Sequence, residues 1–267
     1  MEHLRGRVIN VPISVLDLHG VAQVVANACR GPGGYVGVCN VHSLVTAGRD
    51  AELKEALECS VANTADGMPL VWALRLLGFE QAARVYGQAL MESLMGDESW
   101  GVGRHFLIGS TSGVQERLVQ RIADRFPSAR IVGRWVPPFT GSVPDLPSEV
   151  RERIVASGAQ VVWVGLGCPR QEKWMLRHWR ALAPAVLIGV GAAFDFLAGT
   201  KRAAPGWMRG IGLEWLFRLV TEPRRLAWRY ISTNPAFVWH VSMQILRAGR
   251  SRHHEGNRGP RSKSTWS

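Results

Sequence analysis

The 267-residue sequence lacks several features that mark membrane-spanning, secreted and metal-binding proteins. It has no run of about 18 apolar residues, so we expect no segment to span a bilayer. The first residues, MEHLRGRVINVPIS, lack the apolar core of a signal peptide, and we expect none. The four cysteines form no Cys-x-x-Cys pair and have no matching histidine spacing, which predicts neither a disulfide framework nor a zinc site. A reducing cytosol is the compartment that this cysteine usage indicates.

Acidic residues are scarce in the last quarter of the chain, and the charge is therefore unevenly distributed. Residues 1–200 contain 19 Lys and Arg against 18 Asp and Glu, whereas residues 201–267 contain 13 against 3. The last quarter thus carries +10 of the formal net charge of +11, together with 5 of the 11 tryptophans. Residues 205–250 interleave Trp, Phe, Leu and Arg, which predicts a basic amphipathic helical appendage. Residues 251–267 have almost no apolar content, which predicts a disordered tail.

A basic surface of this kind usually binds nucleic acid or an anionic membrane. Tryptophan and leucine opposite the basic residues favour the membrane interface. We therefore expect an anionic membrane surface to bind residues 205–250, and we expect no nucleic acid.

Short apolar segments alternate with segments of helical composition through residues 1–204. The pattern is clearest where two β-branched runs, 161–164 and 185–190, each end in a Gly-x-Gly turn and flank a helical segment. Such alternation predicts an α/β core with a Rossmann-like parallel sheet flanked by helices. A glycine-rich linker suggests that the core consists of two Rossmann-like halves, with a break near 101–104.

Asp66 is the first candidate for chemistry, because it follows a short apolar strand and precedes a helix. A carboxylate at the carboxyl end of a strand can be partly desolvated, which raises its pKa and makes it a better general base. The alternative is a helix N-cap, since Asp before Gly-x-Pro often begins a helix. The spacing alone favours the cap.

The two glycine-rich turns are the next candidates, because ligands bind at the carboxyl ends of parallel strands. In the turn at 165–172, free N–H groups of the following helix could bind a phosphate, and Gln171 could donate and accept hydrogen bonds. The alternative is an ordinary tight turn. The turn at 189–194 is similar to a dinucleotide fingerprint, but Phe194 replaces its third glycine. This leaves an NAD-dependent oxidoreductase as an alternative, while Asp195 is placed to bind a sugar hydroxyl.

A series of long motifs occurs in a fixed order along residues 8 to 235. They are NVHSLVTA, ADGMPLVWALRLLG, ARVYGQALMESL, FLIGSTSGV, VGLGCPRQEKW, IGVGAAFDFLAG, KRAAPGWMRGIGLEWLFRL and EPRRLAWRY. Together they resemble the WecG/TagA/CpsF family of bacterial glycosyltransferases.

The resemblance implies an inverting enzyme that is cytoplasmic and peripheral on the inner face of the cell membrane. Such enzymes move a hexose or N-acetylhexosamine from a UDP-sugar to a polyprenyl-diphosphate-linked sugar, for exopolysaccharide, teichoic acid or antigen. The UDP-sugar is a substrate, and the resemblance implies no cofactor and no metal. It also allows the chain to form a homo-oligomer. A non-catalytic membrane-binding module is the remaining alternative.

The same resemblance assigns roles to individual residues. It makes Asp66 the general base. The implied substrate-binding residues are Asn40, Arg84, Gln171, Asp195, Arg218, Arg225 and Arg229. The sequence departs from the family pattern at Val38, where many members carry Thr, and at Gln88 and Ala89, where an acidic residue is common. These departures predict a donor other than N-acetylmannosamine, with glucose as one option.

Overall fold

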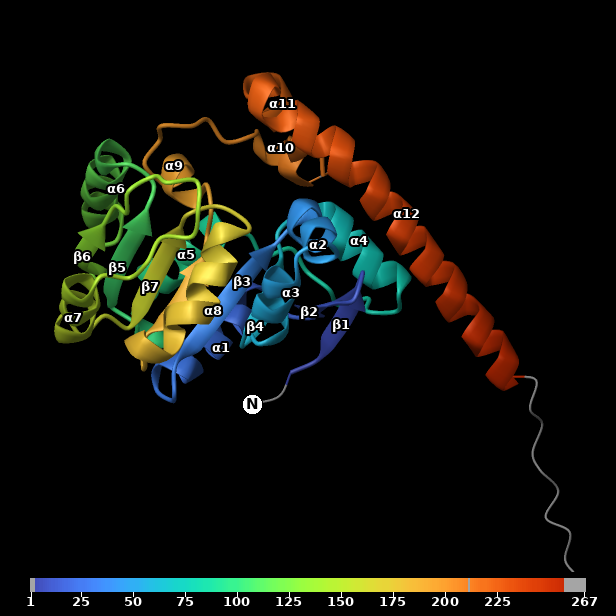
Figure 1. Cartoon of the computed structure of the whole chain (residues 1–267), viewed down its shortest axis with the longest axis horizontal. Coiled ribbons are helices and arrows are strands. Elements are labelled where there is room, and N and C mark those ends of the chain that lie inside the picture. The colour runs from blue at the N-terminus through green and yellow to red at the C-terminus, as the bar shows by residue number, and fades with distance from the viewer. Residues whose placement is uncertain (1–2, 211, 257–267) are drawn as a thin grey trace, which may run out of the picture.

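The computed structural model describes residues 3–210 and 212–256. Six parallel strands form a central sheet in the order β4-β3-β8-β7-β5-β6, and helices cover both of its faces (Figure 1). This confirms the predicted Rossmann-like α/β core. The strands are β3 (Gly34–Cys39), β4 (Ala62–Ala65), β5 (Arg104–Gly109), β6 (Arg130–Trp135), β7 (Val161–Gly165) and β8 (Val186–Gly189).

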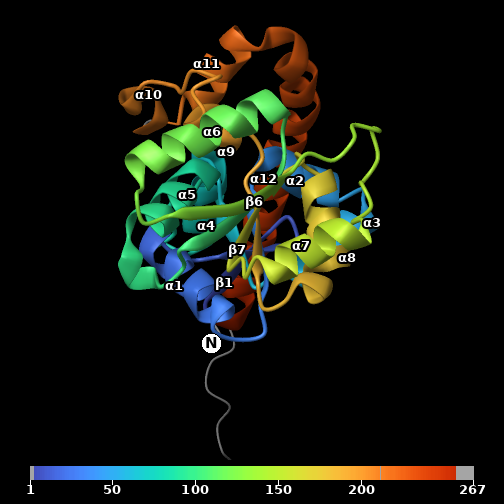
Figure 2. The same ribbon diagram turned by 90° about the vertical axis from the view of Figure 1, so that its left-hand side faces the viewer.

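Figure 2 looks along the sheet from the β6 edge and separates the two helical layers. One layer holds α2 (Val41–Ala47), α3 (Ala51–Glu58), α7 (Ser148–Ala156) and α8 (Arg170–Leu182). The opposite layer holds α1 (Leu18–Cys29), α5 (Gly87–Gly96), α6 (Ser112–Arg125) and α9 (Ala193–Leu197). The short helix η1 (Glu98–Trp100) follows α5, and α4 (Met68–Leu76) follows β4.

The two predicted halves of the core share one sheet. β3 and β4 precede residue 101, whereas β5 to β8 follow it, yet β3 pairs with β8 in the register Val36↔Ile188. All four residues of β8 are buried. On its other edge β8 pairs with β7 in the register Val162↔Leu187, so it is a central strand of the sheet. The break near 101–104 is therefore a loop, and it does not divide the sheet.

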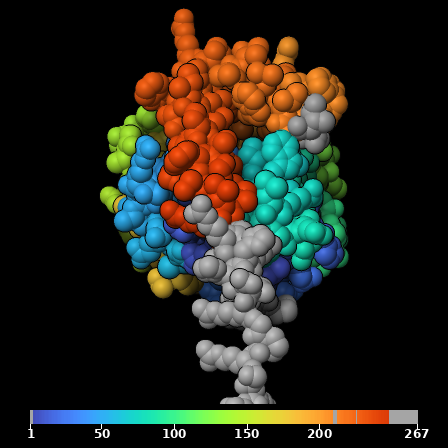
Figure 3. Space-filling view, turned by 90° about the vertical axis from the view of Figure 1, so that its right-hand side faces the viewer, coloured from blue at the N-terminus to red at the C-terminus, as the bar shows by residue number. Residues whose placement is uncertain are grey.

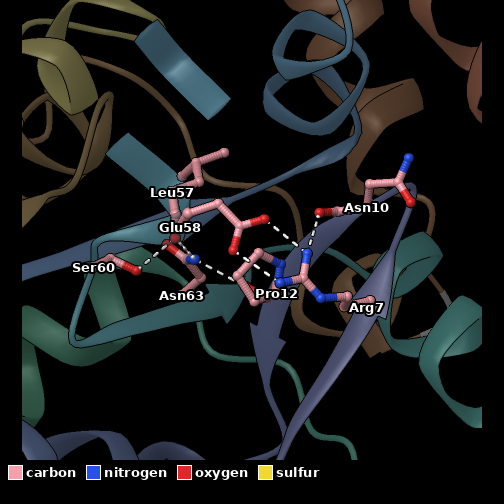
Figure 4. A network of polar contacts seen from close by, with 7 residues as sticks. All are labelled: Arg7, Asn10, Pro12, Leu57, Glu58, Ser60 and Asn63. Atoms are coloured by element: carbon pink, nitrogen blue, oxygen red, sulfur yellow. Dashed lines mark hydrogen bonds and ion pairs between the residues drawn. The ribbon is translucent and has the colours of Figure 1, made fainter. Parts of the chain in front are cut away.

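An antiparallel hairpin of β1 (Arg5–Val8) and β2 (Val11–Ser14) lies beside the β4 edge. Polar contacts fasten it to the core (Figure 4). Arg7 contacts Glu58 at 2.7 Å, and the buried Asn63 amide donates to the Pro12 carbonyl at 2.8 Å. Because Asn63 also donates to the Leu57 carbonyl at 2.6 Å, it ties the hairpin to α3.

The appendage consists of α10 (Gly206–Gly210), α11 (Glu214–Thr221) and the long helix α12 (Pro223–Gly256). α12 packs against α2 and runs along one side of the core (Figure 1). Phe237 and Val241 are buried in the same cluster as Leu44 and Leu70. Gln244 accepts from the Ile9 amide at 2.9 Å and donates to the Arg7 carbonyl at 2.7 Å, which joins α12 to the hairpin.

The end of α12 differs from the prediction. The helix continues to Gly256, whereas the disordered tail was expected to begin at residue 251. It ends at glycine, a residue that disfavours helix. Residues 257–267 lie outside the described residues. In the part of the chain that the structure describes, no helix is both long enough and apolar enough to cross a membrane.

Candidate functional site

The site lies where the chain diverges at the carboxyl ends of neighbouring strands. After β3 the chain enters α2 on one face of the sheet, and after β8 it enters α9 on the other face (Figure 2). β4, which pairs with β3, ends one residue before Asp66. A divergence of this kind opens a crevice at the edge of an α/β sheet.

Asp66 is held at this edge by its own backbone. Its amide donates to the Cys39 carbonyl at 2.7 Å, which extends the pairing of β4 with β3 by one step. Gly67 then begins α4 as the N-cap residue, with φ of 139° and no side-chain hydrogen bond to the helix. Residues other than glycine rarely adopt such a φ. The Asp66 side chain therefore does not cap α4, and the N-cap alternative is wrong.

Three charged side chains from two segments of the chain surround the Asp66 carboxylate. Arg84 Nη2 lies 3.8 Å from Asp66 Oδ1 and 2.5 Å from Glu214 Oε2. Arg218 Nη1 lies 3.9 Å from Glu214 Oε1. Arg84 is in the loop before α5, whereas Glu214 and Arg218 are on α11. The appendage thus supplies part of the charge around the core carboxylate.

Burial is the main reason why the pKa of Asp66 is raised to about 6. The nearby Glu214 carboxylate raises the pKa further, while Arg84 and Arg218 lower it. About a quarter of the Asp66 side chain is exposed, so water and substrate can reach it. A carboxylate with this pKa is ionised at neutral pH and accepts a proton more readily than an ordinary aspartate.

Two arginines beside Asp66 have spare donor capacity. Within the described residues, Arg84 Nε and Arg218 Nε are buried and have no hydrogen-bond partner. Their guanidinium groups lie over aromatic rings, 4.7 Å from the Tyr86 centroid and 5.2 Å from the Phe196 centroid. Buried donors normally have a partner, so this arrangement suits a ligand with several anionic oxygens.

Two cavities meet at Asp66, Glu214 and Arg218, which line both of them. The first cavity lies between the end of β8 and the starts of α5 and α9. Its other lining residues are Tyr86, Gly87, Gln88, Val190, Ala192, Ala193, Phe196, Ala203 and Ala204. The second is a groove of about 490 Å³ bordered by α2, α4, α11 and α12. Asp66 is thus accessible from two directions.

Two more of the predicted site residues, Asn40 and Arg229, line the groove. Asn40 lines the groove and is also the N-cap of α2, where its side-chain oxygen accepts from the Ser43 amide at 3.2 Å. Arg229 of α12 lines the groove as well, with its guanidinium 5.4 Å from the Tyr230 ring centroid. Arg225 is on α12, but its side chain lies outside the described residues.

Gln171 lies behind the cavities and lines neither of them. It is 3% exposed, and its oxygen accepts from the amides of Gly167 at 3.2 Å and Gly191 at 3.1 Å. Its nitrogen donates to Glu172 at 2.9 Å. Gln171 therefore ties the two glycine-rich turns together through the amides of Gly167 and Gly191. The structure places its side chain outside the lining of both cavities, and its contact with substrate stays a prediction.

Asp195 is also outside the lining of both cavities. It lies in the first turn of α9, between Phe194 and the cavity residue Phe196. Its backbone carbonyl accepts from the Thr200 hydroxyl at 3.1 Å, and its side chain lies 3.5 Å from the same hydroxyl. The structure places Asp195 beside the first cavity, in contact with the loop after α9.

Glu214 is a site residue that the sequence reasoning missed. It contacts Arg84 and affects the pKa of Asp66, although 148 positions separate the two carboxylates in the sequence. The sequence did contain a signal for Glu214, because it is one of only three acidic residues among the 13 basic residues of 201–267. Among the described residues, no group of three or more His, Cys, Asp or Glu side chains could hold a metal ion.

Comparison with known proteins identifies relatives along most of the chain. Residues 6–251 match the model of the glycosyl transferase WecG/TagA/CpsF family. An N-acetylglucosaminyldiphosphoundecaprenol N-acetyl-beta-D-mannosaminyltransferase of Bacillus subtilis is 28% identical over 229 residues, which cover 86% of this chain and 84% of that protein. A protein with the same name from Bacillus spizizenii is 31% identical over 191 residues, which cover 72% of this chain and 71% of that protein.

Proposed function

This chain belongs to the WecG/TagA/CpsF family of glycosyltransferases, and we propose that it moves a hexose or N-acetylhexosamine from a UDP-sugar to a polyprenyl-diphosphate-linked sugar. The observation that carries the proposal is the Asp66 carboxylate, with its raised pKa, at the meeting point of two cavities. The names of the two relatives specify transfer of an N-acetylmannosaminyl group to N-acetylglucosaminyldiphosphoundecaprenol, which supports this substrate class.

The reaction is a single displacement with inversion at the anomeric carbon. Asp66 takes the proton from the acceptor hydroxyl while that oxygen attacks C1 of the donor sugar. The bond from C1 to the diphosphate oxygen breaks, and UDP leaves. A positioned base of this kind contributes about 10²–10⁴-fold to the rate. The two cavities would let the donor and the acceptor reach Asp66 by separate routes.

Negative charge grows on the diphosphate as UDP leaves, and the first cavity has groups that stabilise it. Arg218 lines this cavity, and α5 points its N-terminus into it. No side chain caps the first turn of α5. A Cβ atom on Gly87 would lie 3.1 Å from the Val190 carbonyl, so glycine permits this close approach. Guanidinium groups and a helix N-terminus would thus supply the charge, and we propose that no metal is needed.

The donor sugar would be recognised in the same cavity. Gln88 lines this cavity, and its side-chain nitrogen donates to Glu92 at 3.2 Å. This hydrogen bond fixes the orientation of the Gln88 side-chain amide. Asp195 stands next to the cavity and remains a candidate for a sugar hydroxyl. Gln171 would act indirectly, by positioning the two turns that support the cavity.

The two other functions considered from the sequence have weaker support. An NAD-dependent oxidoreductase would use the amides of the turn after β8, but the Gly191 amide is bonded to Gln171. A non-catalytic membrane-binding module is set aside because the family consists of glycosyltransferases.

The appendage would bring the enzyme to its lipid-linked substrate at the inner face of the cell membrane. Four large apolar side chains there, Trp207, Trp228, Ile231 and Trp239, are between 65% and 78% exposed. Residues 205–250 also contain seven arginines against two glutamates. Exposed tryptophan beside basic residues favours an anionic membrane interface. Trp228→Ala combined with Trp239→Ala should weaken binding to anionic vesicles, and unchanged binding would contradict this role.

A transfer assay tests the proposed reaction directly. Wild-type protein should transfer label from a UDP-sugar to a polyprenyl-diphosphate-linked sugar. Asp66→Asn should still bind UDP but lose transfer by about 10²–10⁴-fold. Asp124→Asn, an exposed position on α6, is the matched control and should keep full activity. Transfer by Asp66→Asn within tenfold of wild type would remove Asp66 from the base role.

A further inference from the structure

The groove beside Asp66 changes character along its length. Near Asp66 its lining includes Asn40, Arg84, Arg218 and Arg229. Farther along α4 and α12 the lining is mainly apolar, although Thr233, Asn234 and Ser242 of α12 also line it. These apolar residues are Met68, Trp72 and Leu76 of α4, Trp215 of α11, and Phe237, Val238, Val241 and Ile245 of α12. A ligand that fits this groove therefore has an anionic head and a long apolar tail.

The length and volume of the groove suit a single hydrocarbon chain. Arg229 and Ile245 both line it and are 16 positions apart on α12, which is about 24 Å along a helix. The volume of about 490 Å³ lies within the roughly 300–1,000 Å³ that is usual for small-molecule sites. Figure 3 shows this face, with α12 in orange and red and α4 in teal beside it.

Several apolar side chains at the groove remain accessible to solvent. Trp72 is 46% exposed, Leu76 is 68% exposed and Val238 is 62% exposed. Contiguous exposed apolar surface on a soluble protein commonly marks a binding groove or an interaction site. Because these side chains lead directly to the charged groups at Asp66, the ligand they bind must enter the reaction site as well.

Resting on the proposed function, we infer that this groove binds the first isoprene units of the acceptor's polyprenyl chain. The arginines at its inner end bind the acceptor diphosphate, and the wall formed by α4 and α12 binds the hydrocarbon that follows. The enzyme thus recognises the lipid itself, in addition to the sugar that it modifies. The membrane contacts a different stripe of α12, the one that carries the exposed Trp228 and Trp239.

A binding experiment separates this inference from the transfer reaction. Farnesyl diphosphate, which has an isoprenoid tail on a diphosphate, is titrated against the full chain in solution, and inorganic diphosphate is titrated in parallel. Wild-type protein should bind farnesyl diphosphate at least tenfold more tightly, because the groove removes the tail from water. Equal affinity for the two probes would overturn the inference. Failure of sugar transfer would instead count against the proposed function, because this readout requires no transfer.

A matched pair of variants separates the groove from the membrane face. Val238 and Trp239 are consecutive residues of α12 and are 62% and 65% exposed, but only Val238 lines the groove. Val238→Asp should abolish the preference for farnesyl diphosphate, a loss of about tenfold in affinity, and leave diphosphate binding unchanged. Trp239→Asp should keep the preference and weaken vesicle binding, because consecutive residues of a helix point about 100° apart. If both variants lose the preference equally, or neither does, the groove is not the isoprenoid site.

Discussion

Asp66→Asn should make the protein less active and more stable at the same time. The pKa of Asp66 is raised to about 6 in the folded protein, mainly because the carboxylate is buried. An unfolded chain leaves aspartate near its ordinary pKa of about 3.9. The folded state therefore holds a proton on Asp66 between about pH 4 and pH 6, where the unfolded state has lost it. Ionising this residue in the folded protein costs free energy, and asparagine avoids that cost.

The sign and size of the effect follow from this difference in pKa. The contribution of Asp66 to stability is fully present below about pH 4 and is lost as the pH rises through about 6. A shift of about two units corresponds to at most about 3 kcal/mol. Because a quarter of the side chain is exposed and Arg84 lies 3.8 Å away, we expect about 1–3 kcal/mol. The melting temperature should change by roughly 2–4 °C for each kcal/mol.

The assay compares thermal unfolding of wild type and Asp66→Asn at pH 4.5 and pH 7.5. The variant should gain stability relative to wild type at the higher pH, and the gain should shrink at the lower pH. Other groups titrate in both proteins, so their effects cancel in the difference. In wild type, kcat/KM for transfer should fall about tenfold for each pH unit below 6. A stability difference that is the same at both pH values would refute the reasoning.

Four further predictions address neighbouring features of the site. Glu214→Gln removes a carboxylate that raises the pKa of Asp66, so the acidic limb of the kcat/KM profile should move to lower pH; a limb that stays or rises would contradict this. Gly67→Ala places a side chain at φ of 139°, so calorimetry should show a loss of about 1–3 kcal/mol together with slower transfer, and an unchanged melt would count against the strain argument. Gln171→Leu leaves two turn amides without their acceptor and should cost about 1–3 kcal/mol for each amide that stays dry; unfolding in urea measures it, and an equally stable variant would show that water replaces the side chain. EDTA should leave transfer unchanged, whereas a loss that Mg²⁺ restores would show that the guanidinium groups are insufficient.

The sequence predicted the type of fold well because its signals are local. Apolar runs such as 161–164 and 185–190 indicate buried strands wherever they lie in the sheet. The position of β8 between β3 and β7 was not predicted, since strand order depends on contacts between distant segments. The same limit explains why the single sheet was not predicted, because a glycine-rich linker near residue 101 is compatible with one domain or with two.

The site was predicted in part, and the misses share a physical cause. Asp66 was identified, but spacing could not decide between a base and an N-cap, because that depends on the φ angle of Gly67. Gln171 was expected to bind substrate, yet its oxygen is used by Gly191, which is 20 residues further along the chain. Glu214 was missed because its partner Arg84 is 130 residues away. Gln171 and Glu214 thus depend on partners that only the folded chain brings close.

Membrane binding and catalysis are coupled through α12 if both proposals hold. Trp228 is 78% exposed and belongs to the proposed membrane face, whereas its neighbour Arg229 lines the groove near Asp66. Consecutive residues of a helix point about 100° apart, so one turn serves both surfaces. The Gln244 contacts to the hairpin and the buried Phe237 hold this helix against the core. A lipid surface that shifted α12 would therefore move a cation of the site as well, and an acceptor drawn from that surface would reach Asp66 along the same helix.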